Sequence, residues 1–362
     1  MHYYIISGEL SGDIYGARLI QALKKLDAHH KFTCWGGGYM KNGGGDLIVD
    51  IDSLAFMGFW EVIKNSRVIL KNLIFAKGHI RKTKPDAIIL IDYPGFNIKI
   101  AQYAKKLGIP VFWFVAPQVW AWNKNRIKVM RRCIDKLFVI LPFELSYFNQ
   151  RGINTFYYGH PMLDVVNIPT VDIKKESIIA LMPGSRIQEI NHMLPTMLNA
   201  VKSVDGYRCV VICANNIPIS VYKKIINGAN VTLEYDKSIL KYVTAALVTS
   251  GTATLELAIL KIPQIVCYKL SLVSYFLARF FSSIKYISLV NILADKPVVK
   301  ELIQHDFTVD NIKKELGILL QEKSNKKMIQ AYANVVNQIG PKGCFKNIAL
   351  VIYSDLIDVK NN

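Results

Sequence analysis

The chain has 362 residues, of which 51% are hydrophobic and 11% aromatic; this composition excludes a disordered chain, and the length favours two domains over one. Its 45 Lys and Arg residues outnumber its 27 Asp and Glu residues, which gives a formal net charge of +18. A surface this basic favours negatively charged partners such as nucleic acid, anionic lipid headgroups or phosphorylated small molecules.

In the first half of the chain, short apolar segments alternate with longer amphipathic ones, which is typical of β/α proteins. The amphipathic segments 16–26 and 96–107 place apolar residues at i, i+3, i+4 and i+7, and they predict helices. The apolar segments show little polar alternation, which predicts a parallel sheet covered on both faces. The predicted strands are residues 3–7, 31–36, 87–92, 110–116, 136–141 and 155–159.

This alternation is lost over residues 159–177, where prolines and mixed polar residues predict a linker between domains. It resumes with predicted strands at residues 177–185, 208–215, 245–251 and 263–269. We therefore predict an α/β fold of two Rossmann-like parallel-sheet domains, 1–165 and 175–308, facing across a cleft, and a helical segment over 309–362. Ligands of such sheets bind at the carboxyl ends of the strands.

The segment DAIILIDYPGFN (86–97) places a carboxylate, Asp92, directly after a run of apolar residues and before a Pro-Gly turn. This position predicts that Asp92 lies at the carboxyl end of a buried strand. A charged group at that edge of the sheet is well placed for chemistry on a bound ligand.

The segment LMPGSRIQEI (181–190) reads as a strand, a turn at Gly184 and Ser185, and a helix beginning near Arg186. The free N–H groups of such a helix start, together with a planar cation, suit a diphosphate. The alternative is an ordinary βα turn with a serine cap.

The segment ALVTSGTATLELAIL (246–260) repeats this arrangement, with the turn at Ser250, Gly251 and Thr252. Glu256 follows about one helical turn later, where its carboxylate can accept two ribose hydroxyls, and Thr254 belongs to the same predicted nucleotide site. The alternative is a capping threonine and a solvated glutamate. Two such turns in one domain favour the nucleotide interpretation.

The first turn, SGELSGDIYGARLI (7–20), lacks the glycine spacing of dinucleotide binders and the G-K-[ST] of Walker loops. Glu9, Ser11, Gly12 and Asp13 are predicted to lie on the acceptor side of the cleft or to close it. For Asp13, a helix N-cap is the open alternative.

No metal site and no cofactor are predicted. The acids at 50–52 resemble the D-x-D of some sugar transferases, but they fit a strand with exposed acids equally well, and Arg186 and the helix starts can neutralise a diphosphate. His160 precedes a proline and is expected to be a hydrogen-bonded hinge residue. The cysteines are scattered without metal-binding spacing and are read as reduced.

Two segments, 53–84 and 273–286, combine aromatic and basic residues as interfacial helices do. The alternative is that these aromatic residues are core. The charge of +18 favours contact with anionic lipid, whereas 270–293 is too interrupted by charge to span a membrane. The N-terminus has no signal-peptide pattern. The predicted membrane or acyl-chain residues are Phe56, Met57, Phe59, Trp60, Phe276 and Phe280.

Together these stretches resemble the lipid-A-disaccharide synthase family, glycosyltransferases of the GT-B architecture. VWAW and the Asp that ends the strand 87–92 are specific to that family, whereas the two nucleotide turns are shared more widely. The matching stretches follow the family's order over nearly the whole chain: GELSGDIYGARLI, MGFWEV, PDAIILIDYPGFN, APQVWAWNKNRIK, LPFE, GHPMLD, LMPGSR, SGTATLELAI and YISLVNIL.

The resemblance implies that UDP-2,3-diacylglucosamine and 2,3-diacylglucosamine 1-phosphate (lipid X) give the β-1,6-linked disaccharide phosphate and UDP. Asp92 matches the family's candidate general base, Arg186 an arginine needed for activity, and Asn291 a functional asparagine; Glu9 is a further catalytic candidate. The chain departs from the family at Gly95, where a second Asp is common, and at Val290, where proline is usual.

The implied donor is α-linked and the product β-linked, so a single inverting displacement with Asp92 as base is the simplest path. The expected location is the cytoplasmic face of the bacterial inner membrane, as a peripheral protein on an anionic surface, with a homodimer left open and no nucleic acid partner. The enzymatic rivals are a UDP-N-acetylglucosamine 2-epimerase or a peptidoglycan glycosyltransferase. The rival of another class is a basic, non-catalytic nucleic-acid binder, although no binding motif supports it.

Overall fold

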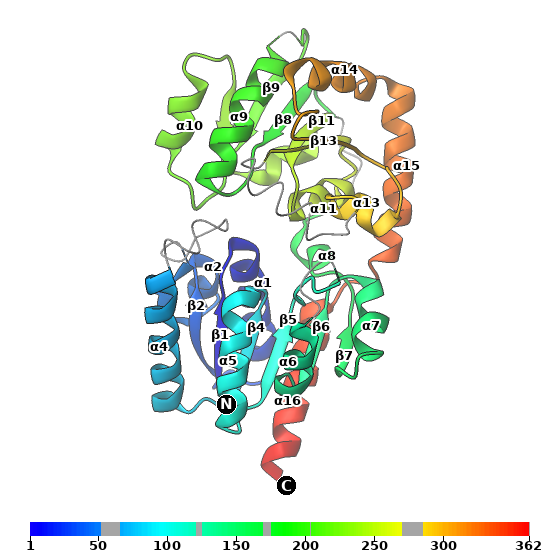
Figure 1. Cartoon of the computed structure of the whole chain (residues 1–362). Coiled ribbons are helices and arrows are strands. Elements are labelled where there is room, and N and C mark those ends of the chain that lie inside the picture. Colours follow the sequence, from blue (N-terminus) through cyan, green and yellow to red (C-terminus); the bar gives the residue numbers. More distant parts are fainter. Residues whose placement is uncertain (52–65, 121–124, 169–174, 203, 270–284, 362) are drawn as a thin grey trace. The chain divides into compact units, whose positions relative to one another are not determined.

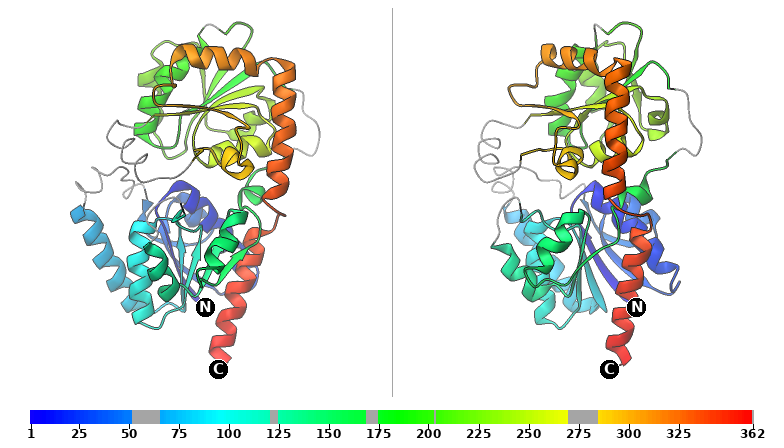
Figure 2. Two further views of the ribbon diagram at one scale, coloured as in Figure 1. Left: turned by 45° about the vertical axis from the view of Figure 1, so that its right-hand side comes forward. Right: turned by 90° about the vertical axis from the view of Figure 1, so that its right-hand side faces the viewer.

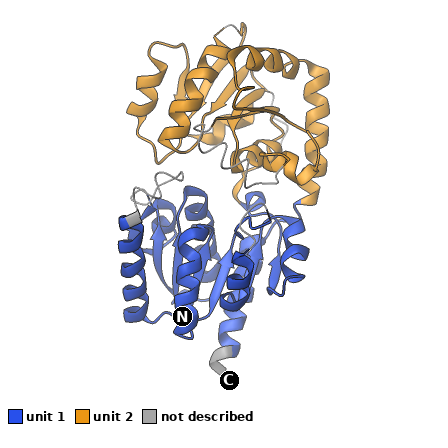
Figure 3. Cartoon of the chain, viewed as in Figure 1, with its two compact units in different colours: residues 1–164, 339–362 blue, residues 165–338 orange. Residues whose placement is uncertain are grey.

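The structure is a computed structural model, and it describes residues 1–51, 66–120, 125–168, 175–202, 204–269 and 285–361. The chain forms two compact units, which Figure 3 distinguishes by colour. Unit 1 comprises residues 1–164 and 339–362, and unit 2 comprises residues 165–338. The helical segment expected over 309–362 is thus divided between the two units.

Unit 1 contains a seven-stranded parallel sheet, whose strands are labelled in Figure 1. Its central strands consist mainly of buried apolar residues, as expected of a sheet covered on both faces. The strand order is β3 (Asp46–Asp50), β2 (Lys31–Gly36), β1 (His2–Ser7), β4 (Ala87–Ile91), β5 (Val111–Phe114), β6 (Lys136–Val139) and β7 (Thr155–Tyr157).

Helices cover both faces of this sheet. One face is packed by α4 (Ser66–Thr83), α5 (Pro94–Lys106) and α6 (Arg126–Cys133), which share a core with β1, β4 and β5. On the other face α1 (Leu10–Lys24) packs against α2 (Gly38–Asn42) and α16 (Cys344–Asn361). Figure 2 shows α16, in red, running alongside the rest of unit 1 in both views. Helices α7 (Pro142–Asn149) and α8 (Met162–Val165) complete the unit.

Unit 2 contains a six-stranded parallel sheet. Helices α9 (Ile187–Val201), α10 (Ile219–Ile226) and α14 (Val309–Leu319) pack on one face. Helices α11 (Thr252–Ile259), α13 (Leu289–Ala294) and α15 (Glu322–Gln338) contact one another, and a 3-10 helix, η2, spans Lys237–Tyr242. The strand order is β10 (Thr232–Glu234), β9 (Arg208–Ile212), β8 (Ile178–Met182), β11 (Ala245–Thr249), β12 (Gln264–Tyr268) and β13 (Lys300–Ile303).

The predicted fold class is confirmed, since each unit is a Rossmann-like parallel sheet wound with helices. In each unit the first three strands are laid down outward in one direction, and the fourth strand then lies on the other side of the first. Each sheet therefore has a switch point, between β1 and β4 in unit 1 and between β8 and β11 in unit 2. Ligands of this fold bind at the carboxyl ends of the strands at that point.

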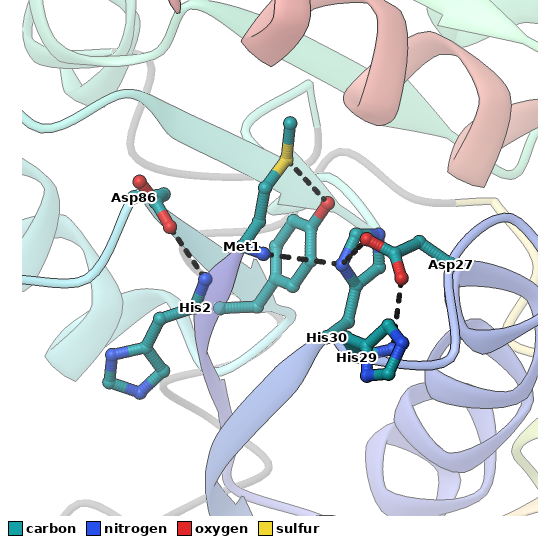
Figure 4. Close-up of polar contacts among 7 residues, drawn as sticks. Met1, His2, Asp27, His29, His30 and Asp86 are labelled. Atoms are coloured by element: carbon teal, nitrogen blue, oxygen red, sulfur yellow. Dashed lines mark hydrogen bonds and ion pairs between the residues drawn. The ribbon is translucent and has the colours of Figure 1, made fainter.

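At the amino ends of the unit 1 strands, a separate set of polar contacts connects neighbouring parts of the sheet and is drawn in Figure 4. Asp86 accepts a hydrogen bond from the backbone N–H of His2 at 2.6 Å, which fixes the start of β4 beside the start of β1. His30 lies 3.3 Å from the carboxylate of Asp27. These residues lie at the opposite ends of the strands from Asp92, so they hold the sheet together and take no part in the candidate site.

Across the described ranges, no helix combines the length and the apolarity that crossing a membrane requires.

Candidate active site

Asp92 lies at the switch point of unit 1, immediately after β4, as the sequence predicts. Asp92 and Tyr93 both have left-handed backbone conformations, with φ of 48° and 49°, which non-glycine residues rarely adopt. The buried side chain of Asn97 donates a hydrogen bond to the carbonyl of Asp92 at 2.8 Å. The turn is therefore held in an unusual shape that presents a half-buried carboxylate at the edge of the sheet.

The loop after β1 packs directly against this turn. A side chain on Gly8 would place its Cβ 2.4 Å from the ring of Tyr93, so only glycine allows the two loops to approach this closely. Burial raises the pKa of Tyr93, and the charge of Glu9 raises it further. Glu9, the N-cap residue of α1, thus lies in the same neighbourhood as the turn that carries Asp92.

Of the residues predicted beside Glu9, two serve the fold. Gly12 packs on β1, where a Cβ would come within 2.7 Å of Ser7 Oγ. Asp13 is buried, and its carboxylate accepts the backbone N–H groups of Gly37, Tyr39 and Met40 at 2.7–3.0 Å. It therefore stabilises the start of α2, and the alternative that Asp13 caps its own helix, α1, is wrong because Glu9 holds that position. Ser11 is partly exposed in the first turn of α1.

In unit 2, the strand β8 is followed by a turn that leads into α9, as the sequence predicts. Gly184 has φ of +114°, and Arg186, rather than Ser185, is the N-cap residue of α9. Glu189 accepts the N–H of Ser185 at 3.1 Å and the guanidinium of Arg186 at 2.7 Å. The serine cap offered as the alternative is thus not observed. Glu189 was not among the residues predicted from the sequence, although an acid three residues after a helix start is a known capping signal.

The turn after β11 lies beside the first across the switch point of unit 2. Gly251 has φ of +157° and is the N-cap residue of α11, and the buried Thr254 donates its hydroxyl to the carbonyl of Gly251 at 2.9 Å. Thr252 is the first residue of α11. Glu256 is paired with Lys237 at 2.7 and 3.0 Å, so it is not the solvated glutamate of the alternative interpretation.

Asn291 is buried in α13, and its amide makes three hydrogen bonds of 2.9 Å. Two join it to the backbone of Val299, and the third goes to the carboxylate of Glu301. Glu301 also accepts the N–H groups of Ile287 and Ser288, while Ser250 Oγ donates to the carbonyl of Ile287 at 2.8 Å. Asn291 is therefore linked to the Ser250 turn through a polar network, and its centre is Glu301, which was not predicted from the sequence.

Several sequence predictions concern residues away from these turns. Within the described part of the chain, no cluster of three or more His, Cys, Asp or Glu residues is arranged to hold a metal ion. His160 is fully buried, and its Nδ1 accepts the N–H of Met162 at 3.1 Å. The predicted membrane residues Phe56, Met57, Phe59, Trp60, Phe276 and Phe280 lie outside the described residues.

Comparison with known structures agrees with this architecture. A Staphylococcus aureus structure, "MnaA-UDP co-structure", has a TM-score of 0.68 and 14% identity, covering 98% of this chain and 97% of that one. The calicheamicin glycosyltransferase CalG4 has a TM-score of 0.59 and 12% identity, covering 98% and 97%. Likeness at this level of identity establishes the fold alone.

Comparison of sequences establishes the family. The family model described as Lipid-A-disaccharide synthetase matches residues 3–348. The lipid-A-disaccharide synthase of Syntrophus aciditrophicus is 37% identical over 372 residues, covering 96% of each chain. That of Trichlorobacter lovleyi is 33% identical over 369 residues, covering 97% of this chain and 96% of the relative. The chain thus belongs to the lipid-A-disaccharide synthase family, the glycosyltransferases of lipid A biosynthesis.

Proposed function

We propose that this chain transfers the 2,3-diacylglucosaminyl group of UDP-2,3-diacylglucosamine to the 6-hydroxyl of lipid X, with inversion, giving the β-1,6-linked disaccharide 1-phosphate and UDP. One observation carries the proposal: the residues singled out from sequence lie at the switch points of both sheets, Asp92 in unit 1 and the turns of Gly184 and Ser250 in unit 2. Ligands of such sheets bind there.

Unit 2 is assigned the donor. The turns after β8 and β11 each lead into a helix start, whose N–H groups favour a diphosphate, and Arg186 adds a fixed cation. Glu256 is assigned the ribose hydroxyls, with Lys237 orienting its carboxylate. The Staphylococcus aureus neighbour is a co-structure with UDP, and this supports a uridine nucleotide as the ligand of the present chain.

Unit 1 is assigned the acceptor. The carboxylate of Asp92 takes the proton of the 6-hydroxyl while that oxygen attacks the anomeric carbon and the bond from that carbon to the diphosphate oxygen breaks. The electron pair of that bond leaves with UDP, where Arg186 and the helix starts stabilise the charge. Glu9 and Ser11 are assigned to the acceptor, whereas Asn291 acts through the loop that holds Ser250.

An exposed surface of α4 that combines apolar and basic side chains supports the lipid nature of both substrates. Leu70, Ile74 and Phe75 are exposed by 56%, 63% and 49%, and Lys71 and Arg81 are exposed on the same helix. Exposed apolar residues mixed with cations are typical of helices that lie on anionic bilayers. We assign the protein to the cytoplasmic face of the bacterial inner membrane, where its acylated substrates would be anchored.

The test is an assay with the two acylated glucosamine substrates, followed by the mass of the product. A disaccharide phosphate together with stoichiometric UDP is expected. UDP released without a disaccharide would contradict the acceptor assignment, and epimerisation of soluble UDP-N-acetylglucosamine would favour the epimerase rival. Salt-dependent binding to random DNA, without binding to anionic vesicles, would favour the nucleic-acid rival.

A further inference from the structure

Glu144 is a buried carboxylate that the mechanism above does not use. It is 1% exposed and lies in the first turn of α7, directly after β6. Burial raises its pKa to about 7, and the hydrogen bonds from Trp120 and the backbone act in the other direction. A carboxylate in such surroundings is costly unless its oxygens are well paired.

The two carboxylate oxygens of Glu144 accept hydrogen bonds from different groups. Oε2 accepts the backbone N–H of Leu141 at 3.1 Å, which ties the carboxylate to the start of its own helix. Oε1 accepts the indole N–H of Trp120 at 2.9 Å, across 24 residues of sequence. Stabilising the start of α7 needs only the first bond, so the second holds the indole in a fixed position.

Trp120 and Phe143 form an aromatic pair on the surface of unit 1. Their rings meet edge to face, with centroids 5.1 Å apart and an angle of 83°. Phe143 is 39% exposed and Trp120 is partly exposed, so both rings are accessible although their neighbour Glu144 is buried. With its N–H engaged, the indole offers only apolar ring surface to a ligand.

The topology places this pair at the carboxyl ends of the strands of unit 1, where Asp92 also lies. Asp92 follows β4, Trp120 lies in the loop that begins after β5, and Glu144 follows β6, and these are three consecutive neighbours in a parallel sheet. The backbone N–H of Asp92 donates to Phe114 at 3.1 Å, and that of the next residue, Val115, to Phe138 at 3.0 Å. The loop with Trp120 thus starts between the base and the buried carboxylate.

We propose that Glu144 is a positioning residue of the acceptor site: by holding the indole N–H of Trp120 it fixes an aromatic surface, Trp120 with Phe143, against which the acylated acceptor sugar binds. The inference rests on the proposed function, because it assigns this surface to the acceptor of that reaction. Aromatic rings bind the apolar faces of sugars and acyl chains alike, and neither source requires a polar contact from the indole.

The test compares Trp120→Phe, which keeps a ring but loses the N–H, with Glu144→Gln, which keeps the shape but loses one of the two acceptor oxygens. Each is expected to raise the acceptor KM about tenfold, the loss typical of a hydrogen bond to a charged group, and to leave the donor KM unchanged. The double variant should resemble either single one, because both remove the same bond.

Trp113→Phe is the matched control, since its indole also donates a hydrogen bond, to the carbonyl of Val115 at 3.1 Å, but lies fully buried in the core. It should lower the thermal midpoint without changing the acceptor KM. An acceptor KM that stays at the wild-type value in Trp120→Phe would overturn this inference but would leave the proposed function standing. Wild-type protein that forms no disaccharide would overturn the proposed function as well.

Discussion

Arg186 and Glu189 form an ion pair of 2.7 Å within the first turn of α9, at the switch point of unit 2. The second oxygen of Glu189 accepts the N–H of Ser185 at 3.1 Å. A single carboxylate therefore shapes the turn and orients the guanidinium. The cation assigned to the diphosphate is held in place before any ligand arrives, which is the condition under which electrostatic stabilisation is most effective.

This turn makes Gly184 irreplaceable. An alanine there would place its Cβ 2.3 Å from the Glu189 carboxylate, on a backbone with φ of +114°. We expect Gly184→Ala to weaken UDP binding about tenfold or more, measured by titration calorimetry. The control is Gly317→Ala in α14, where a Cβ meets no atom within 4 Å. That variant should bind UDP normally, and equal UDP affinity in both would contradict the prediction.

At Asp92, chemistry can be separated from binding. Asn tolerates the left-handed backbone that Asp92 adopts, so Asp92→Asn should fold normally. We expect it to bind UDP like the wild type but to lose turnover by at least about a hundredfold, as removal of a general base does. Calorimetry with UDP and the disaccharide assay give the two numbers. Near-normal turnover would remove Asp92 from the role of base.

Replacement of Gly95 by Asp is a change that should stabilise the protein. Gly95 lies in the first turn of α5, is exposed, and a Cβ there would meet no atom within 4 Å. An acid near a helix start is favoured by the helix dipole, and replacing glycine lowers the entropy of the unfolded chain. We expect Gly95→Asp to raise the thermal midpoint by about 2 °C. Gly95→Ala, the control for entropy alone, should gain less, and a lower midpoint for Gly95→Asp would contradict the account.

Because of the buried His160, we expect the free energy of unfolding to fall in acid. Burial lowers its pKa from 6.5 to about 3, so the unfolded chain binds a proton at pH values where the folded chain does not. Its contribution to stability is present above pH 6.5 and is lost as the pH falls towards 3. Between pH 7.5 and pH 5 the free energy of unfolding should fall by about 2 kcal/mol from this residue.

The matched variant for that measurement is His160→Asn. Its Oδ1 can accept the Met162 N–H in place of Nδ1 but does not titrate. Urea unfolding at both pH values should therefore show a smaller pH dependence in the variant than in the wild type. The same slope in the two proteins would show that His160 does not set it.

The surface of α4 gives a prediction for lipid binding. Replacing Leu70 and Ile74 together by Ser should weaken binding to vesicles of phosphatidylglycerol and phosphatidylethanolamine at least tenfold, because two apolar side chains no longer enter the bilayer. Both are exposed, so folding should be unaffected. Ile318→Ser, which changes an isoleucine 43% exposed on α14, is the control. Co-sedimentation that is equal for all three proteins would exclude α4 as the contact surface.

The central strands could be predicted from the sequence because they are buried on both faces and therefore uniformly apolar. The strands β10 and β13 were missed, and a strand at β3 was only one of two interpretations of its acids, since all three lie at sheet edges and consist mainly of exposed or partly buried residues. The ends of strands that are followed by glycine-containing turns could also be predicted from the sequence. For this reason Asp92, Gly184 and Gly251 are found where the sequence predicts them, at the carboxyl edges.

The hydrogen-bond partners of the polar side chains could not be predicted from the sequence. Asp13 looks like a site residue until its three backbone partners around α2 are seen. Glu301 and Glu144 bind groups 10 to 24 residues away, and no local pattern encodes such pairs. These roles depend on which loops the sheet order brings together, and that order is a property of the whole fold.

The return of α16 to unit 1 has a consequence for synthesis on the ribosome. Phe345 of α16 packs on Tyr15 and Phe114, and Lys136 is paired with Asp355, so the helix covers part of the unit 1 core. These residues are translated only after all of unit 2. During synthesis, part of the apolar core of unit 1 therefore stays uncovered until unit 2 has been translated. Unit 1, whose sheet is made first, completes its packing last.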